Sequence, residues 1–115
     1  MDKYTILHNP RCSKSRQTLA ILEEKGAETE VVKYLEETPS IEEIKAILKK
    51  LNISARELMR TKEDEYKTLG LKDETDEEKL IEAMAEHPKL IERPIVIKGD
   101  RAVLGRPPEK VLELF

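Results

Sequence analysis

The amino-terminal third of the chain follows a strand, helix and strand pattern, and this pattern leaves few folds open. The run 4–8 is rich in β-branched and aromatic residues, and Pro10 ends it because proline has no amide proton for a β-ladder. Ser13 can cap a helix that ends at Gly26, and a second strand follows over residues 29–33. The pattern predicts a βαβ unit with parallel strands and a right-handed crossover.

The middle of the chain is helical, and its helix starts are clearly marked. Three Ser/Thr-x-x-Glu patterns, at residues 40–43, 54–57 and 75–78, are typical of capping boxes, in which a hydroxyl and a carboxylate bind the free amides of a helix start. Apolar residues recur at helical spacing after the first and the last of these boxes, so both helices have a face to bury. Short helical pieces are expected between them, and Pro88 ends the last long helix.

The end of the chain has the pattern of a β-hairpin followed by a helix. Apolar runs at residues 95–97 and 102–104 flank Gly99-Asp100, which is typical of a tight turn. Pro107-Pro108 suits the first turn of a final helix, because the amides of that turn have no helical acceptor.

The complete order is β-α-β, a helical segment and β-β-α, which predicts an α/β fold with a thioredoxin-like mixed sheet. We expect a single domain over residues 1–115 with a helical insertion at about 38–90. The net charge of −3 argues against a nucleic-acid-binding surface. Neither a membrane-spanning apolar stretch nor a signal-peptide pattern occurs, so a cytoplasmic location without membrane contact is expected.

Cys12 is the only cysteine in the sequence. This excludes an internal disulfide, a CxxC redox pair and a cysteine-rich zinc or iron–sulfur site. Cys12 stands between the first strand and the first helix, where unpaired amides and the helix dipole favour a thiolate and can hold an anion. His8, Arg11 and Ser15 are near enough in sequence to add to this effect, although a lone cysteine is more often a small buried apolar residue.

Two cysteine motifs can be compared with this segment. A tyrosine-phosphatase-like loop needs an arginine six residues after the cysteine, and Thr18 stands there. The segment from Cys12 to Ser15 is instead a CxxS arrangement, at the place where dithiol oxidoreductases carry CxxC. Such a site can form a mixed disulfide but cannot resolve it internally, so it needs a thiol from outside the chain.

Three arginines stand near the ends of predicted elements, namely Arg60, Arg93 and Arg106. Taken singly, each is most simply a solvated surface charge. The planar guanidinium group also suits a tetrahedral oxyanion, and three such groups around one thiolate would need an anionic ligand. The residues by themselves leave both interpretations open.

Several segments together carry a specific signature. They are residues 8–16 (HNPRCSKSR), 34–36 (YLE), 55–60 (ARELMR), 92–96 (ERPIV) and 105–108 (GRPP). In this order they resemble the glutaredoxin-linked arsenate reductase (ArsC) family, and most closely its short single-domain members. The resemblance covers essentially the whole chain.

The resemblance implies a role for each matched residue. Cys12 would be the catalytic nucleophile, and His8 would support its thiolate. The residues expected to bind the oxyanion are Arg60, Arg93, Arg106, Ser15 and Arg11. Members of the family also have a cis peptide bond before the proline that faces the cysteine, which here is Pro94.

The resemblance also implies a reaction. In the family the thiolate attacks arsenate, glutathione displaces an oxygen to give a mixed thiol adduct, and glutaredoxin supplies the final reduction that releases arsenite. Arsenate or a similar oxyanion is therefore the expected substrate, glutathione the co-substrate and glutaredoxin the protein partner, with no bound cofactor or metal.

Two other functions stay open. Spx-type regulators use the same fold to bind RNA polymerase without catalysis, but they typically carry a CxxC switch where this chain has Ser15. A general glutathione mixed-disulfide oxidoreductase would share the fold and the cysteine and would differ in its substrate. His8 can also be read as an ordinary buried histidine at a strand end.

Overall fold

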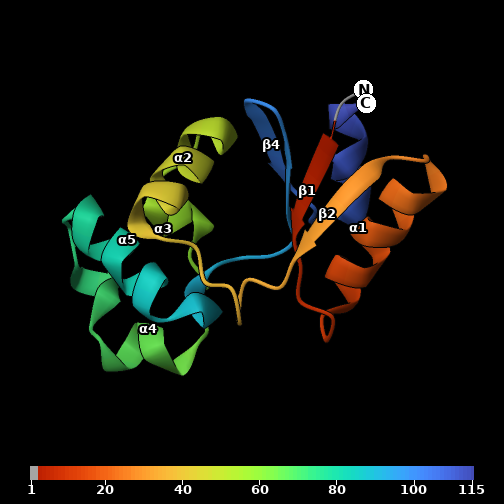
Figure 1. Ribbon diagram of the computed structural model, residues 1–115. Helices are drawn as coiled ribbons and strands as arrows, with labels where there is room; N and C mark the ends of the chain where they lie inside the picture. Colours follow the sequence, from red (N-terminus) through yellow and green to blue (C-terminus); the bar gives the residue numbers. More distant parts are fainter. Residues whose placement is uncertain (1–2) are drawn as a thin grey trace. The chain divides into compact units, whose positions relative to one another are not determined.

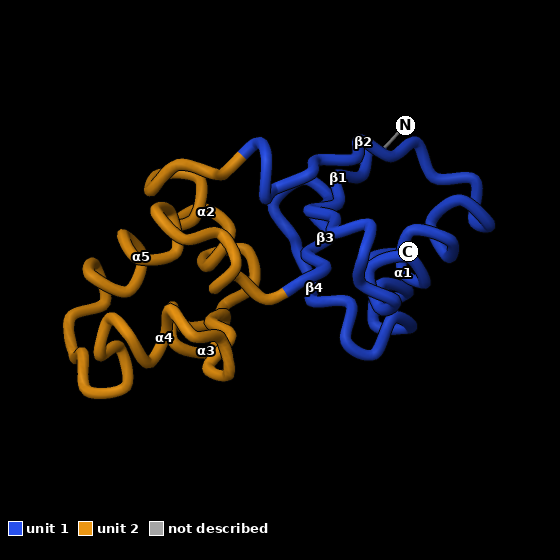
Figure 2. The backbone as a smooth tube through the Cα atoms, turned by 90° about the horizontal axis from the view of Figure 1, so that it is seen from below, with its two compact units in different colours: residues 1–37, 93–115 blue, residues 38–92 orange. Residues whose placement is uncertain are grey.

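The computed structural model describes residues 3–115 (Figure 1), which form two compact units (Figure 2). Unit 1 consists of the residues up to Glu37 together with Arg93–Phe115, and unit 2 consists of Thr38–Glu92. Unit 1 is therefore built from the two ends of the chain, and unit 2 is the helical segment between them. That the units form one domain stays a prediction.

Unit 1 contains a four-stranded mixed sheet in the order β2-β1-β3-β4. Its strands are β1 (Lys3–Leu7), β2 (Glu28–Val32), β3 (Ile95–Lys98) and β4 (Arg101–Leu104). β1 pairs in parallel with β2, whereas β3 runs antiparallel to both β1 and β4. The predicted βαβ unit and hairpin are confirmed, and Gly99 takes the positive φ of 61° that the tight turn favours.

The first helix, α1 (Ser13–Glu24), begins at Ser13 itself, so the prediction that Ser13 caps it is wrong. Cys12 holds the N-cap position, and its carbonyl accepts the first helical hydrogen bond from the Arg16 amide at 3.0 Å. The physical reason is a turn in which the Asn9 carbonyl accepts the Cys12 amide at 3.0 Å and so leads the chain into the helix at Ser13. Cys12 makes no side-chain capping bond to this helix.

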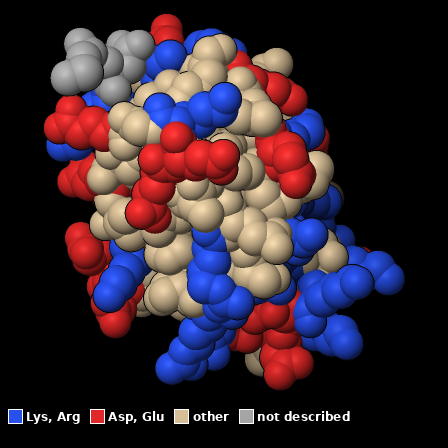
Figure 3. All heavy atoms as spheres, turned by 90° about the vertical axis from the view of Figure 1, so that its right-hand side faces the viewer, with Lys and Arg blue, Asp and Glu red and all other residues tan. Residues whose placement is uncertain are grey.

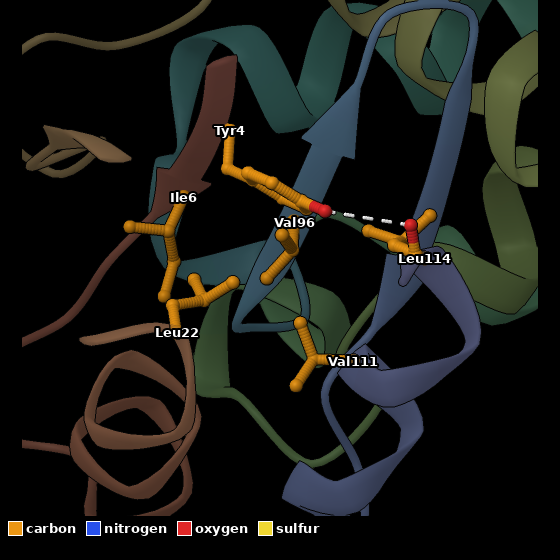
Figure 4. Packing of buried hydrophobic residues seen from close by; sticks show 6 residues of the cluster. All are labelled: Tyr4, Ile6, Leu22, Val96, Val111 and Leu114. Atoms are coloured by element: carbon orange, nitrogen blue, oxygen red, sulfur yellow. Dashed lines mark hydrogen bonds between the residues drawn. The ribbon is translucent and has the colours of Figure 1, made fainter. Parts of the chain in front are cut away.

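The core of unit 1 is formed by side chains from β1, β3, α1 and the last helix, and they meet in Figure 4. These residues are Tyr4, Ile6, Leu22, Val96, Val111 and Leu114. All are at most 5% exposed, and full burial of an aliphatic side chain of this size contributes about 1.5–3 kcal/mol. This core fixes α1, and therefore Cys12 at its start, to the sheet.

The last helix, η3 (Pro108–Leu114), is a 3₁₀ helix rather than a regular α-helix. Side chains from the strands of the sheet donate hydrogen bonds to the last carbonyl groups of η3. The Leu114 carbonyl accepts hydrogen bonds from Lys98 Nζ at 2.9 Å and from the Tyr4 hydroxyl at 3.5 Å, and the Glu113 carbonyl accepts one from Arg101 at 2.8 Å. Cationic donors at a helix end satisfy carbonyls that have no helical partner.

Unit 2 is helical apart from an isolated antiparallel β-bridge between Met59 and Ile91. Its elements are α2 (Ile41–Leu51), α3 (Ala55–Leu58), α4 (Asp64–Thr68), η1 (Leu71–Asp73), α5 (Glu77–Glu86) and η2 (Pro88–Leu90). The Arg56 guanidinium joins three of them, because it donates to the Tyr66 hydroxyl at 2.7 Å and to the carbonyls of Leu71 and Glu74. Across residues 3–115, no helix combines the length and apolar character needed to cross a bilayer.

Two of the three predicted capping boxes are confirmed. Ser40 with Glu43 caps α2, and Ser54 with Glu57 caps α3, each with both reciprocal hydrogen bonds. The third is wrong, because α5 is capped by Asp76, whose Oδ1 accepts the Glu78 amide at 3.0 Å. Aspartate is as good an N-cap as serine, and the adjacent Asp76 takes the position one residue later than the box pattern places it.

This cap assignment gives a simple stability test. Asp76→Ala is expected to lower the free energy of unfolding by about 1 kcal/mol, because the Glu78 amide loses its acceptor. Thr75→Ala, the matched control one residue earlier, is expected to change it by less than about 0.5 kcal/mol. Urea denaturation measures both, and a larger loss for Thr75→Ala than for Asp76→Ala would restore the original assignment.

Candidate active site

Cys12 lies in unit 1 at the start of α1, where its side chain is largely buried. The amides of the next three residues, Ser13, Lys14 and Ser15, have no hydrogen-bond acceptor among the residues that the structure describes. The first turn of α1 also contains no acidic side chain. Free amides and the positive end of the helix dipole can bind an anion beside Cys12.

Asn9 organises the loop that leads to Cys12 through three hydrogen bonds. Its Oδ1 accepts the Arg11 amide at 3.0 Å, its carbonyl accepts the Cys12 amide, and its own amide donates to Ser15 Oγ at 3.1 Å. Asparagine commonly closes turns in this way with its side chain. The sequence signals a turn at Asn9-Pro10, but the contribution of Asn9 to the site was not predicted.

His8 follows β1 and is buried, and its ring is bonded to Ser15. Nδ1 lies 2.6 Å from Ser15 Oγ, and the His8 amide donates to the Val32 carbonyl at 2.8 Å. Burial, followed by the positive charges of Lys33 and Arg16, lowers the pKa of His8 below its ordinary value of about 6.5. His8 is therefore mainly a neutral imidazole at neutral pH.

Gly105 packs against both Pro94 and Thr18 of α1. The Arg93–Pro94 peptide bond is cis, as the family resemblance implies. The Gly105 amide donates to the Pro94 carbonyl at 2.9 Å, and the Gly105 carbonyl accepts from the Thr18 hydroxyl of α1 at 3.4 Å. A methyl group at Gly105 would lie 2.5 Å from Thr18 Oγ1 and 2.8 Å from Pro94 Cγ. Only glycine allows the three segments to approach this closely.

Arg93 and Arg106 flank this contact and lie side by side. Nη1 of Arg106 donates to the Arg93 carbonyl at 3.2 Å, and the Nε and Nη1 atoms of Arg93 are buried. Both arginines belong to unit 1, which also contains Cys12. Their contact with a bound anion stays a prediction.

Arg60 and Arg11 have different surroundings. Arg60 belongs to unit 2, where it forms ion pairs of 3.9 Å with Glu63 and 3.7 Å with Glu92, and its amide donates to the Leu90 carbonyl at 2.7 Å. The predicted convergence of Arg60 with the other arginines therefore stays a prediction. Arg11 is exposed on the loop before Cys12, and its role in binding is also untested.

The stretch of chain that contains Cys12 is positively charged, although the chain is acidic overall. Every Asp, Glu, Lys or Arg side chain from Lys3 to Leu22 is a Lys or Arg, in a chain whose net charge is −3. On the face that Figure 3 shows, Lys and Arg side chains are concentrated in the lower half, with a few acidic side chains among them. Within residues 3–115, no group of three or more His, Cys, Asp and Glu side chains is arranged to hold a metal ion.

The mixed sheet with a lone cysteine at the start of its first helix defines a thioredoxin-like protein that carries CxxS in place of a dithiol motif. The model of the ArsC family matches residues 7–114, and the chain belongs to this family.

Individual relatives agree with this assignment. The uncharacterized protein YfgD of Escherichia coli K12 is 57% identical over 111 residues, which are 95% of this chain and 93% of that protein. An arsenate reductase of Haemophilus influenzae is 51% identical over 112 residues, which are 96% of this chain and 97% of that protein. The solved structure of an arsenate reductase from Vibrio cholerae is 52% identical, covers 99% of this chain and 98% of its own, and superimposes with a TM-score of 0.96. These matches confirm the thioredoxin-like fold and the predicted family.

Proposed function

We propose that this protein is an arsenate reductase in which Cys12 is the nucleophile and the second thiol comes from glutathione. The observation that carries the proposal is the place of the only cysteine, at a helix start with three free amides and no acidic residue in its first turn. The full-length similarity to proteins named arsenate reductase supports the choice of substrate.

The first step forms a covalent bond to arsenic. The Cys12 thiolate attacks arsenate, a sulfur–arsenic bond forms, and one arsenate oxygen leaves with a proton as hydroxide or water. Arsenic keeps its oxidation state of five in this step. The amides at the start of α1, with the guanidinium groups of Arg93 and Arg106, are proposed to bind the remaining oxygens.

The two electrons come from external thiols. A glutathione thiolate displaces a second oxygen and gives an adduct in which arsenic bridges Cys12 and glutathione. A glutaredoxin thiolate then attacks the glutathione sulfur and forms a mixed disulfide with it. The bond between glutathione and arsenic breaks, and its electron pair reduces arsenic to the trivalent state. Water releases arsenite and restores the Cys12 thiolate. A cytoplasmic location suits this cycle, because thiols are kept reduced there.

The proposal is tested by coupling arsenate reduction to NADPH oxidation. The purified protein is mixed with glutathione, glutaredoxin, glutathione reductase and NADPH, and arsenate is added last. We expect NADPH consumption that depends on arsenate and on glutaredoxin. No arsenate-dependent consumption at any thiol concentration would rule the function out.

Substitution of Arg93 separates arsenate reduction from general mixed-disulfide chemistry. Arg93→Ala is expected to lower kcat/KM for arsenate by about 100-fold, which corresponds to loss of one charged hydrogen-bond donor to the oxyanion. Reduction of a glutathionylated peptide, measured in parallel, is expected to change less than about threefold. Arg101→Ala, an exposed arginine bonded to the Glu113 carbonyl, is the matched control. Equal losses in both reactions would favour the general oxidoreductase.

A further inference from the structure

The Ser15 hydroxyl lies between two groups of the candidate active site. It is 2.6 Å from His8 Nδ1 and accepts the Asn9 amide at 3.1 Å, and Ser15 itself is fully buried. Ser15 was predicted from the sequence to bind the oxyanion. In the structure its partners are the imidazole ring and the loop backbone, and its contact with an oxyanion stays a prediction.

The donors and acceptors around Ser15 determine which group donates in the hydrogen bond between Ser15 and His8. The Asn9 amide can only donate, so one lone pair of Ser15 Oγ is already used. Within residues 3–115, the only acceptor in hydrogen-bonding contact with the Ser15 hydroxyl proton is His8 Nδ1. If Nδ1 carried the proton instead, the hydroxyl proton would be buried without an acceptor, which is unfavourable.

The charge state of the ring agrees with this direction. Burial and the nearby charges of Lys33 and Arg16 lower the pKa of His8, so the doubly protonated ring is the minor form at neutral pH. A neutral imidazole has one protonated nitrogen. With Nδ1 accepting from Ser15, that nitrogen is Nε2.

We propose that Ser15 is a positioning residue that holds His8 as a neutral imidazole with its proton on Nε2. His8 then offers a hydrogen-bond donor and not a proton-accepting nitrogen on the side of the ring that faces away from Ser15. A hydrogen-bond donor favours a nearby anion without carrying a charge of its own. The effect on turnover rests on the proposed arsenate reduction, whereas the tautomer does not.

Nitrogen NMR measures the tautomer directly. Long-range ¹H–¹⁵N spectra of the ¹⁵N-labelled full chain near pH 8 distinguish protonated from unprotonated ring nitrogens, and His87→Gln assigns the two histidines. We expect an unprotonated Nδ1 and a protonated Nε2 for His8 in the wild type. A protonated Nδ1 overturns the proposal, and this measurement needs no variant of Ser15 or His8.

Variants of Ser15 test whether this residue sets the tautomer of His8. Ser15→Ala is expected to lower the ratio of the Nε2–H to the Nδ1–H form by about fivefold, because one hydrogen bond to Nδ1 is lost. Ser15→Thr keeps the hydroxyl and is expected to restore the wild-type ratio. Ser13→Ala, an exposed serine in the same turn, is the matched control. An unchanged ratio in Ser15→Ala overturns the role given to Ser15.

Arsenate kinetics separate positioning from substrate binding. Ser15→Ala is expected to lower kcat about tenfold and to leave KM for arsenate within about twofold, because Ser15 acts through His8. A raised KM with an unchanged tautomer would show that Ser15 binds the oxyanion and would overturn the proposal. Absence of turnover in the wild type would end the proposed function, and the NMR result would still decide the tautomer.

Discussion

Cys12→Ser is expected to lower arsenate-dependent NADPH oxidation by a factor on the order of 10³ or more, because it removes the only thiol in the chain. The serine hydroxyl can occupy almost the same space, but it is hardly ionised at neutral pH, whereas a free thiol with a pKa near 8.5 already supplies a few per cent of thiolate.

The comparison needs a control in the same turn. Ser13→Ala removes only an exposed side chain next to Cys12 and keeps the backbone amide, so turnover is expected to stay within about twofold of the wild type. Circular dichroism and the urea midpoint should be the same for wild type and Cys12→Ser, so that a loss of turnover reflects chemistry and not folding. Turnover by Cys12→Ser within tenfold of the wild type would show that Cys12 is not the nucleophile.

Gly105→Ala is expected to lower the free energy of unfolding by about 1–3 kcal/mol, because its methyl group would overlap atoms that cannot easily move. The overlap is with Thr18 Oγ1 at 2.5 Å and Pro94 Cγ at 2.8 Å, and both residues are buried. In thermal unfolding this corresponds to a fall in Tm of roughly 5–15 °C. The new methyl group also pushes apart α1 and the segment that carries Arg93 and Arg106, so arsenate turnover should fall with stability.

Two further variants separate this steric effect from other costs. Gly99→Ala introduces a methyl group at a φ of 61° with no atom within 4 Å, so its cost of about 1–2 kcal/mol is purely conformational. Thr18→Ala removes two of the three atoms that the new methyl group would meet. In the double variant the two losses should therefore be less than additive. Strict additivity of Thr18→Ala and Gly105→Ala would contradict the steric explanation.

The sheet and its connections could be predicted because they depend on local signals. Strand patterns, a helix that ends near Gly26 and a Gly-Asp turn are each read within a few residues, and the right-handed crossover follows from general geometry. The start of α1 was placed one residue late. The serine suits an N-cap, and the competing turn closed by Asn9 depends on backbone geometry that the sequence does not show.

The contacts that build the site could not be predicted in the same way. Thr18 and Gly105 are 87 residues apart, and nothing in their local sequences indicates that they touch. The bond between His8 and Ser15 was also missed, because Ser15 was interpreted as support for the Cys12 thiolate, as a replacement for a second cysteine and as an oxyanion ligand. The roles of Arg93 and Arg106 came from family resemblance, since an arginine near a strand end is usually a surface charge.

The hydrogen bond between His8 and Ser15 also argues against the alternative of an Spx-type regulator. A redox switch of the CxxC type needs a second thiol at position 15, where this chain has a fully buried serine that is bonded to His8 and to the Asn9 amide. A buried hydroxyl with both hydrogen-bond roles used is a structural part of the loop and has no redox chemistry. The positive loop around the lone cysteine is better suited to an anionic substrate.

A crystal structure of the wild-type protein soaked in arsenate tests most directly whether Cys12 is the nucleophile. We expect arsenic bonded to Cys12 Sγ, with its oxygens on the free amides of Ser13, Lys14 and Ser15 and the guanidinium groups of Arg93 and Arg106 beside them. Arsenate bound elsewhere, with Cys12 unmodified in crystals of protein that reduces arsenate in solution, would contradict the proposed mechanism.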